Sequence, residues 1–379
     1  MKRLIYLISL LLGVVSGAGA GDIVPGAIWP DDRGIHVNAH GGGVLYAEGV
    51  YYWFGEFKSD TTSLALDGVT CYSSTDLTRW KYEGIAMPVM PEGSYSDIER
   101  GCILERPKVI YNARTGKYVM WFHLELKGKG YAAARAGVAV SDKVTGPYRF
   151  VRSSRACAGA WPENLTEEQR TDKATPADFA DWWTPAWRRA VEDGLFTRRD
   201  HLGGQMSRDM TLFVDDDGKA YHVYASEENL TLQVAELTDD YLDYTGRYIR
   251  IAPGGHNEAP ALFKRGGTYF MITSGCTGWD PNEARLFSAP SIWGPWSQHP
   301  NPCRGADASL TFHSQGTYVL PVHGKKDAFI FMADRWTPRH PSDARYIWLP
   351  IRFEEGLPVL RWMDRWNLDT FDEDERSGR

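Results

Sequence analysis

The sequence predicts an all-β fold, a five-bladed β-propeller with one helical insertion between the second and third blades. One observation is a pair of strand-like segments that recurs five times along the 379 residues. Another is that each interval between copies has room for about four strands, which is typical of a propeller blade. The third is a single interval that is too long and has helical periodicity.

Each of the five copies begins with a polar residue at the head of a strand. A turn containing Gly, Asp or Asn follows, and then a second strand rich in Tyr, Phe, Trp and Met. The five first strands are expected at residues 40–46, 105–111, 207–213, 256–261 and 313–319. The innermost strand of a propeller blade lines the central channel. We therefore expect the polar heads of the five strands to face one mouth of that channel.

The long interval spans about residues 152–205. Its apolar residues recur at spacings of four, as on one face of a helix: Trp183, Trp187, Val191 and Leu195. Pro185 falls inside this pattern, so one bent helix and two short helices are both compatible with it. The insertion is interpreted either as a surface feature or as a lid that supplies Trp side chains beside the mouth.

The first 20 residues have the features of a secretory signal peptide. A short basic start precedes an apolar run, and the small residues Ala18, Gly19 and Ala20 follow it. The apolar run is about 12 residues, too short to span a bilayer, and no later stretch is long enough. We expect a secreted or periplasmic protein with a single domain over residues 21–379. Residues 372–379 read as a charged tail.

Charge and composition restrict the partners. The formal net charge is −7 and there is no basic cluster, so nucleic acid is not an expected partner. The ten His residues form no metal-binding motif, and no cofactor is expected, although the sequence leaves open a structural cation in the channel. Five cysteines are present; Cys276 and Cys303 could pair, or the thiols could be free and buried. The oligomeric state is not determined.

Aligning the five copies brings together the chemically active residues His40, Glu105, Asp209, Glu258 and Gln315. Three carboxylates at one mouth repel one another, so at least one of them should have a raised pKa. An inverting glycosidase needs a carboxylic acid on one side of the glycosidic bond and a group that activates water on the other. The three carboxylates therefore indicate hydrolysis of a glycoside.

Several motifs carry a resemblance to a known family across most of the chain outside the insertion. They lie at residues 40–43, 71–77, 105–108, 207–213, 257–261 and 273–279. Together they resemble glycoside hydrolase family 43, in its exo-β-1,3-galactanase-like branch. The resemblance implies that Glu258 is the general acid and that Asp209 orients it and raises its pKa. The family's usual Asp base in blade one is absent, because His40 stands there.

The resemblance further implies that Gln315 positions the attacking water and that Glu105 binds the sugar. Glu56, at the end of the second strand of blade one, is the best carboxylate substitute for the missing base. Other candidates for sugar binding are Glu227, Asn229, Thr277, Trp279, Tyr131 and His40. Each carboxylate also has a structural interpretation, in which Asp209 pairs with Arg208 or Arg106, Glu105 pairs with Lys108, and Glu258 caps backbone N–H groups.

We therefore expect an inverting hydrolase that removes terminal galactose from β-1,3-galactan or arabinogalactan side structures. One alternative is the same fold acting on α-L-arabinofuranosyl or β-galactofuranosyl ends. Another is a sugar-binding propeller without turnover, which the missing base in blade one would explain.

Overall fold

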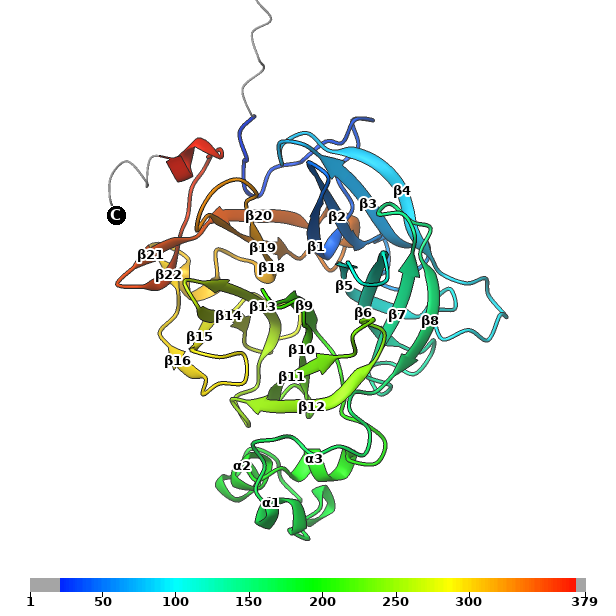
Figure 1. Ribbon diagram of the computed structural model, residues 1–379, viewed down its shortest axis with the longest axis vertical. Coiled ribbons are helices and arrows are strands. Elements are labelled where there is room, and N and C mark those ends of the chain that lie inside the picture. Colours follow the sequence, from blue (N-terminus) through cyan, green and yellow to red (C-terminus); the bar gives the residue numbers. More distant parts are fainter. Residues whose placement is uncertain (1–20, 373–379) are drawn as a thin grey trace, which may run out of the picture.

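The computed structural model describes residues 21–372, which form an all-β propeller with a group of short helices at one edge (Figure 1). The predicted signal peptide and the charged tail from residue 373 lie outside the described residues. Four sheets have four antiparallel strands each. The first two contain β1 (His40–Ala47), β2 (Val50–Glu56), β3 (Gly68–Ser74) and β4 (Lys81–Pro88), then β5 (Ile103–Asn112), β6 (Lys117–Glu125), β7 (Arg135–Ser141) and β8 (Arg149–Ser154).

The remaining sheets lie in the second half of the chain. The third and fourth contain β9 (Met210–Val214), β10 (Ala220–Ser226), β11 (Thr231–Leu237) and β12 (Tyr244–Ile251), then β13 (Glu258–Arg265), β14 (Thr268–Ser274), β15 (Ala284–Ala289) and β16 (Ser297–His299). The last two have three strands each: β18 (Gln315–Pro321), β19 (Phe329–Arg335) and β20 (Arg345–Pro350), and β17 (Cys303–Arg304), β22 (Leu357–Arg361) and β21 (Arg352–Glu354).

The prediction of five blades is wrong, because the described residues form six sheets. The five predicted hairpins are present as β1–β2, β5–β6, β9–β10, β13–β14 and β18–β19. The sixth sheet contains one short hairpin, β21–β22, whose strands are three and five residues long. Its strand β17 is two residues long and pairs in parallel with β22, which lies far away in the sequence. A search for repeated hairpins therefore could not reveal this sheet.

The five strands with polar heads surround the centre of the propeller (Figure 1). Strand β1 contacts β5, β5 contacts β9, β9 contacts β13, β13 contacts β18, and β18 contacts β1. Four of these strands have a β-bulge just after the polar head. A bulge re-aims the side chain beside it. The residues after three of the heads, Gly41, Arg106 and Ala259, all have positive φ angles near 50–60°.

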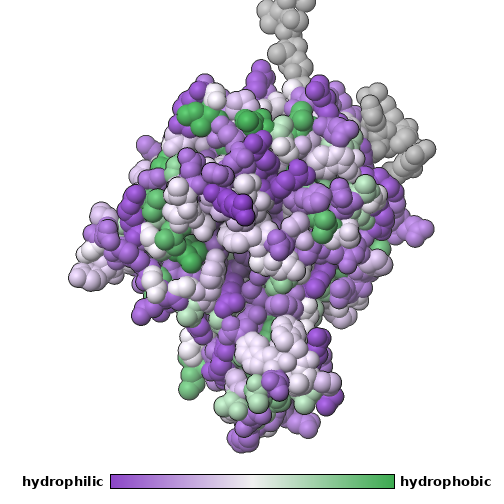
Figure 2. Space-filling model, turned by 180° about the vertical axis from the view of Figure 1, so that it is seen from behind, coloured by the Kyte–Doolittle hydropathy of each residue, from purple (hydrophilic) through white to green (hydrophobic). Residues whose placement is uncertain are grey.

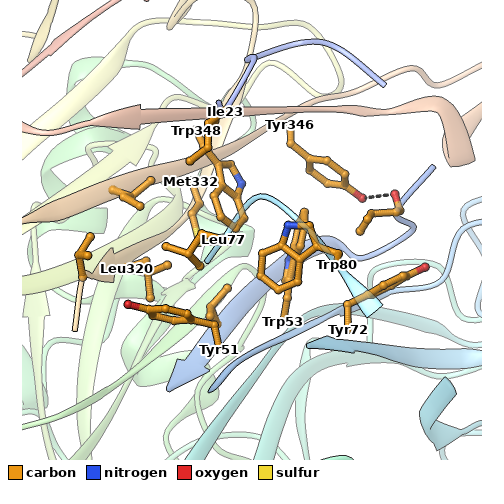
Figure 3. Close-up of a cluster of buried hydrophobic side chains, with 14 of the residues drawn as sticks. Ile23, Tyr51, Trp53, Tyr72, Leu77, Trp80, Leu320, Met332, Tyr346 and Trp348 are labelled. Atoms are coloured by element: carbon orange, nitrogen blue, oxygen red, sulfur yellow. Dashed lines mark hydrogen bonds between the residues drawn. The ribbon is translucent and has the colours of Figure 1, made fainter. Parts of the chain in front are cut away.

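An aromatic cluster joins the first sheet to the β18–β20 sheet (Figure 3). Trp53 is 1% exposed, and its ring packs edge to face on Tyr346 at 4.5 Å and on Trp80 at 5.1 Å. The Tyr346 hydroxyl donates to the Val37 carbonyl over 2.7 Å, so its polar end is satisfied inside the cluster. Because the cluster spans the start and the end of the ring, it holds the propeller closed.

The insertion follows β8 and contains α1 (Glu167–Thr171), η1 (Pro176–Asp178), α2 (Pro185–Glu192) and α3 (Leu195–Asp200). The periodic stretch is thus two short helices. Helix α2 begins at Pro185 after the Thr184 cap, and Gly194, with φ 89°, separates α2 from α3. Figure 2 shows the insertion as a lobe at the foot of the molecule. Two further short helices, η2 (Ala308–Leu310) and η3 (Pro341–Asp343), lie in loops.

A buried ion pair anchors the insertion to the β9–β12 sheet. Arg250 in β12 donates to Glu227 over 2.7 Å and also to the carbonyls of Val191 and Glu192 in α2. Thr197 in α3 donates to the same Glu227 carboxylate over 2.9 Å. These contacts fix both helices against the propeller at one point.

The five cysteines are all free, so Cys276 and Cys303 are not paired. Four of them are buried, and Cys276 is partly exposed. Within residues 21–372, no helix is long and apolar enough to cross a membrane.

Candidate active site

A pocket of about 370 Å³ lies where the polar heads of the inner strands meet. Its lining contains Glu56, Lys58, Glu105, Arg106, His123, Tyr131, Arg208, Asp209, Asn229, Glu258, Gly278, Trp279, Gln315 and Trp336. Charged side chains and Trp rings together suit a sugar, which has polar hydroxyls and apolar ring faces.

Glu258 begins β13 and is the carboxylate of the pocket best suited to hold a proton. Its Oε1 accepts a hydrogen bond from Asn229 Nδ2 over 2.8 Å, and its Oε2 lies 3.4 Å from Gln315 Nε2. Burial, and then the charge of Asp209, raise its pKa from the ordinary 4.5 to about 7. A carboxyl with this pKa is partly protonated at neutral pH and can act as a general acid.

Asp209 lies one residue before β9 and pairs with Arg106. The guanidinium donates two hydrogen bonds to the carboxylate, over 3.0 and 2.8 Å. The second oxygen also accepts from the backbone N–H of Ala259 over 3.2 Å, directly beside Glu258. The pairing with Arg106 is therefore present, and it fixes Asp209 where its charge acts on Glu258.

Gln315 at the start of β18 has a fully engaged amide. Its Oε1 accepts from Arg106 Nη2 over 2.6 Å and from Trp336 Nε1 over 3.0 Å. Both of these groups can only donate, so the amide oxygen must face them. Its Nε2 lies 3.0 Å from Ser274 Oγ and 3.4 Å from Glu258. The long contact to Glu258 is the one that a ligand or water would replace first.

Glu105 in β5 is held by two donors. Tyr131 donates its hydroxyl to Oε1 over 3.0 Å, and Oε2 lies 3.1 Å from His123 Nδ1. Burial opposes ionisation of Glu105, but the hydrogen bond and charge of His123 outweigh it and lower the pKa to about 2. Glu105 does not pair with Lys108, whose ammonium donates to the carbonyls of Gly41 and Arg106.

Comparison with known proteins identifies the family. A model described as glycosyl hydrolases family 43 matches residues 184–348. A solved GH43 β-1,3-galactosidase with galactodeoxynojirimycin is 61% identical, with a TM-score of 0.89. The match covers 91% of this chain and 100% of that one. This chain belongs to glycoside hydrolase family 43.

Two solved exo-β-1,3-galactanase structures are more distant. An exo-β-1,3-galactanase from Phanerochaete chrysosporium with galactose is 32% identical over 92% of this chain and 68% of that chain, with a TM-score of 0.73. One from Clostridium thermocellum is 36% identical over 91% and 66%, with a TM-score of 0.72. A curated relative, a β-D-galactofuranosidase from Aspergillus niger, is 32% identical over 121 residues. That match spans 31% of this chain and only 35% of the relative. The family resemblance and the likeness to its galactanases are thus confirmed.

Glu56 lines the pocket of this family 43 protein and is 3% exposed. Its Oε1 accepts from the backbone N–H of Arg106 over 2.9 Å, and its Oε2 lies 2.5 Å from Lys58 Nζ. Burial raises its pKa, and the Lys58 charge opposes that shift. Glu56 is therefore a carboxylate inside the pocket with more affinity for a proton than Glu105.

Three further candidates also reach the pocket. Asn229, Tyr131 and Trp279 line it, and Trp279 packs edge to face on Trp336 at 5.6 Å. This pair of Trp rings forms an aromatic wall beside Gln315. Such a wall can pack against the apolar face of a sugar ring.

Three candidates are placed elsewhere. His40 is fully buried and stacks on Tyr346 at 5.4 Å, outside the pocket lining. Glu227 is 0% exposed and holds the insertion through Arg250. Thr277 bonds within its own loop, donating to the Asp280 carbonyl over 2.6 Å.

The insertion contributes no residue to the pocket lining. Its Trp183 ring instead contacts His256, two residues before Glu258, at 5.0 Å. The insertion therefore makes a contact near the mouth, as the lid interpretation requires, but it forms no wall of the pocket.

Sequence reasoning did not find Lys58, His123 and Trp336, and it named Arg106 and Arg208 only as structural partners of Asp209. Two of them, His123 and Trp336, lie at the end of the second strand of a hairpin, as Glu56 does at the end of β2. His123 lies near the end of β6, and Trp336 comes directly after β19. Reading the ends of all second strands would have found both.

A metal ion does not fit the cluster formed by Glu105, His123 and Asp209, whose donor atoms lie within 4.8 Å of one another. Both ring nitrogens of His123 face carboxylates. Asp209 is already neutralised by Arg106. A ligating imidazole needs a free lone pair, and His123 offers none here.

Proposed function

We propose that this protein is an exo-acting β-1,3-galactosidase that removes terminal galactose from β-1,3-galactan or arabinogalactan side structures, with inversion. The observation that carries the proposal is the 61% identity to a GH43 β-1,3-galactosidase over that protein's whole length. Galactanases that act on the same linkage match less closely over most of this chain.

Glu258 is the general acid in this proposal. It gives its proton to the glycosidic oxygen as the bond to the anomeric carbon breaks, so the leaving sugar departs as a neutral alcohol. Asp209 supports this role because its charge raises the Glu258 pKa. Its hydrogen bond from the Ala259 N–H also fixes the backbone that carries Glu258.

Water attacks the anomeric carbon from the opposite side, and Gln315 positions it. Arg106 and Trp336 already donate to the Gln315 oxygen. The water therefore binds at Nε2, after the contact between Nε2 and Glu258 is broken. A water that accepts a hydrogen bond from Nε2 keeps one lone pair for attack and has two protons to donate. A carboxylate must take up one of them.

Glu56 is better suited than Glu105 to accept that proton. The Glu56 pKa is raised by burial, whereas the Glu105 pKa is lowered to about 2. A carboxylate with so low a pKa holds a proton weakly. Glu105 then serves as an acceptor for sugar hydroxyls, together with Tyr131 and Asn229.

Proton NMR of the reaction on β-1,3-galactobiose tests the proposal, because it reports the sugar released and its anomeric form. Galactose should appear first as the α-anomer, and Glu258→Gln should release it at least about a hundredfold more slowly. Absence of galactose with the wild-type protein over a long incubation would reject the proposal. Initial formation of the β-anomer would reject the inverting mechanism but not the galactosidase activity.

A second candidate is hydrolysis of β-galactofuranosyl ends. It is favoured by the local match to the Aspergillus niger β-D-galactofuranosidase, 32% identical over 121 residues. Parallel assays on aryl β-galactopyranoside, β-galactofuranoside and α-L-arabinofuranoside separate the possibilities. A non-catalytic sugar-binding role, motivated by His40 in place of a base, predicts binding of galactose without turnover of any of these compounds.

We also propose that the mature protein is secreted or periplasmic. The basic and apolar pattern of residues 1–20 supports this. N-terminal sequencing of the protein from a fractionated culture tests it, and mature protein that retains the first 20 residues in the cytoplasm would contradict it.

A further inference from the structure

Glu125 is a buried carboxylate that the proposed mechanism does not use. Glu125 ends β6 and is 0% exposed. Its Oε1 lies 2.9 Å from His123 Nε2, and its Oε2 accepts from the backbone N–H of Ala134 over 2.8 Å. A buried charge is costly unless it is paired. Glu125 therefore depends on His123 for its only charged partner among the described residues.

His123 is placed between two carboxylates. Its Nδ1 faces Glu105 at 3.1 Å, and its Nε2 faces Glu125 at 2.9 Å. Ionised carboxylates can only accept hydrogen bonds, so each ring nitrogen must carry a hydrogen to make both contacts. With both carboxylates ionised, this geometry makes the ring a charged imidazolium, shared between one carboxylate in the pocket and one beneath it.

We propose that Glu125 and His123 are positioning residues that keep Glu105 ionised and oriented as an acceptor for the hydroxyls of the bound galactosyl unit. This inference rests on the proposed function for the identity of the sugar. The chain of contacts runs from Glu125 through His123 to Glu105, where Tyr131 fixes the other oxygen at 3.0 Å. Neither Glu125 nor His123 reacts with the substrate in this scheme.

Other charged groups around Glu105 do not replace His123. The charges of Lys58 and Arg106 also lower the Glu105 pKa, but their own ion pairs are with Glu56 and Asp209, so His123 is the charged group that contacts the Glu105 carboxylate. Three further carboxylates lie near Glu105, those of Glu56, Asp209 and Glu258, and their negative charges oppose its ionisation. His222, which faces His123 from β10, stays neutral because burial lowers its pKa to about 3.

Glu125 secures the charge of the His123 ring. Burial opposes that charge, but the hydrogen bonds to Glu105 and Glu125 raise the His123 pKa to about 9. Without the Glu125 charge, the ring can give up its Nε2 proton and become neutral. Glu105 would then face other carboxylates without a charged donor, and its pKa would rise. A protonated Glu105 has fewer lone pairs for sugar hydroxyls.

The test compares Glu125→Gln with the wild type by imidazole nitrogen NMR and by galactose binding. The His123 ring should be charged near neutral pH in the wild type and neutral in the variant. Binding is measured by calorimetry in a Glu258→Gln background, which removes the titration of the acid. Loss of a charge-assisted contact should weaken galactose binding by about tenfold or more. In the otherwise wild-type enzyme, KM should rise more than kcat falls.

Glu83→Gln is the matched control. Glu83 lies in β4, where its partners are Ser73 and Lys81 on the outer part of the propeller. It undergoes the same chemical change and should leave the ring signal and galactose binding unchanged. A merely structural role of Glu125 would lower thermal stability without changing the charge of the His123 ring.

Unchanged galactose binding in Glu125→Gln would overturn the inference, as would a neutral His123 ring in the wild type. If the variant does not fold, the pH dependence of galactose binding by Glu258→Gln decides. Affinity should fall together with the charge of the His123 ring, near its pKa of about 9; a ring that loses its charge near pH 6–7, as an ordinary histidine does, contradicts the inference. If no galactose binds at all, the proposed function fails, while the ring signal still tests the charge of His123.

Discussion

Replacing Asp209 by Asn should move the alkaline limit of activity to lower pH. Asp209 is the largest contributor after burial to the raised Glu258 pKa of about 7. The substitution removes this negative charge and also frees the charge of Arg106, which lowers the Glu258 pKa. Both effects act in the same direction, so the pKa of the acid should fall by about one unit or more.

The size of the effect depends on pH. With a pKa of about 7, roughly a quarter of Glu258 is protonated at about pH 7.5, and a decrease of one unit leaves roughly 3%. The activity should therefore fall roughly eightfold at about pH 7.5 from this cause alone. At about pH 5 nearly all of the acid is protonated in both proteins, and the difference should almost vanish.

The assay is the pH profile of kcat/KM on β-1,3-galactobiose. Asp239→Asn is the control, because Asp239 is an exposed partner of Arg114 on the outside of the propeller. Thermal unfolding must accompany the kinetics, since breaking the buried pair with Arg106 also costs stability. A loss of activity that is equal at all pH values would refute the electrostatic role of Asp209 and leave only a positioning role.

Three more predictions address the acid, the core and the insertion. Glu258→Gln should lower kcat by about 10²–10⁴-fold while galactose still binds, which product analysis and calorimetry check; turnover within tenfold of wild type would contradict the assignment. Trp53→Ala, at a side chain 1% exposed, should reduce the free energy of unfolding by about 3–5 kcal/mol in urea denaturation; a loss below about 1 kcal/mol would show that the cluster does not close the ring. Glu227→Gln should speed amide hydrogen exchange in α2 and α3, because both helices are tied to this carboxylate or to its partner Arg250. Unchanged exchange in both helices would mean that the apolar contacts of Trp187 and its neighbours hold the insertion alone.

Much of the site could be predicted from the sequence because the hairpins repeat. The heads Glu105, Asp209, Glu258 and Gln315 all reach the pocket, since equivalent strands of a propeller present equivalent positions to the centre. The number of sheets could not be predicted in this way. The β17–β22 pairing joins short segments that are distant in the sequence, and no local pattern marks it.

The exceptions within the site have local causes that the sequence does not display. His40 occupies a head position, but its ring packs against Tyr346 from the end of the chain. Glu227, Glu228 and Asn229 all have positive φ angles, so the backbone turns sharply through three residues. Of these three, only Asn229 lines the pocket. Composition and spacing do not decide which side chain of such a turn faces inward.

The pocket separates its carboxylates by the burial and the charges that each one meets. Glu258 is buried beside the negative charge of Asp209, and its pKa rises to about 7. Glu105 meets a charged imidazolium, and its pKa falls to about 2. Burial beside a like charge favours the protonated form of a carboxyl, whereas a cation at hydrogen-bond distance keeps it ionised. One cavity can therefore hold a proton donor and a permanent acceptor side by side, and the choice between them is made by residues that never touch the reacting bond.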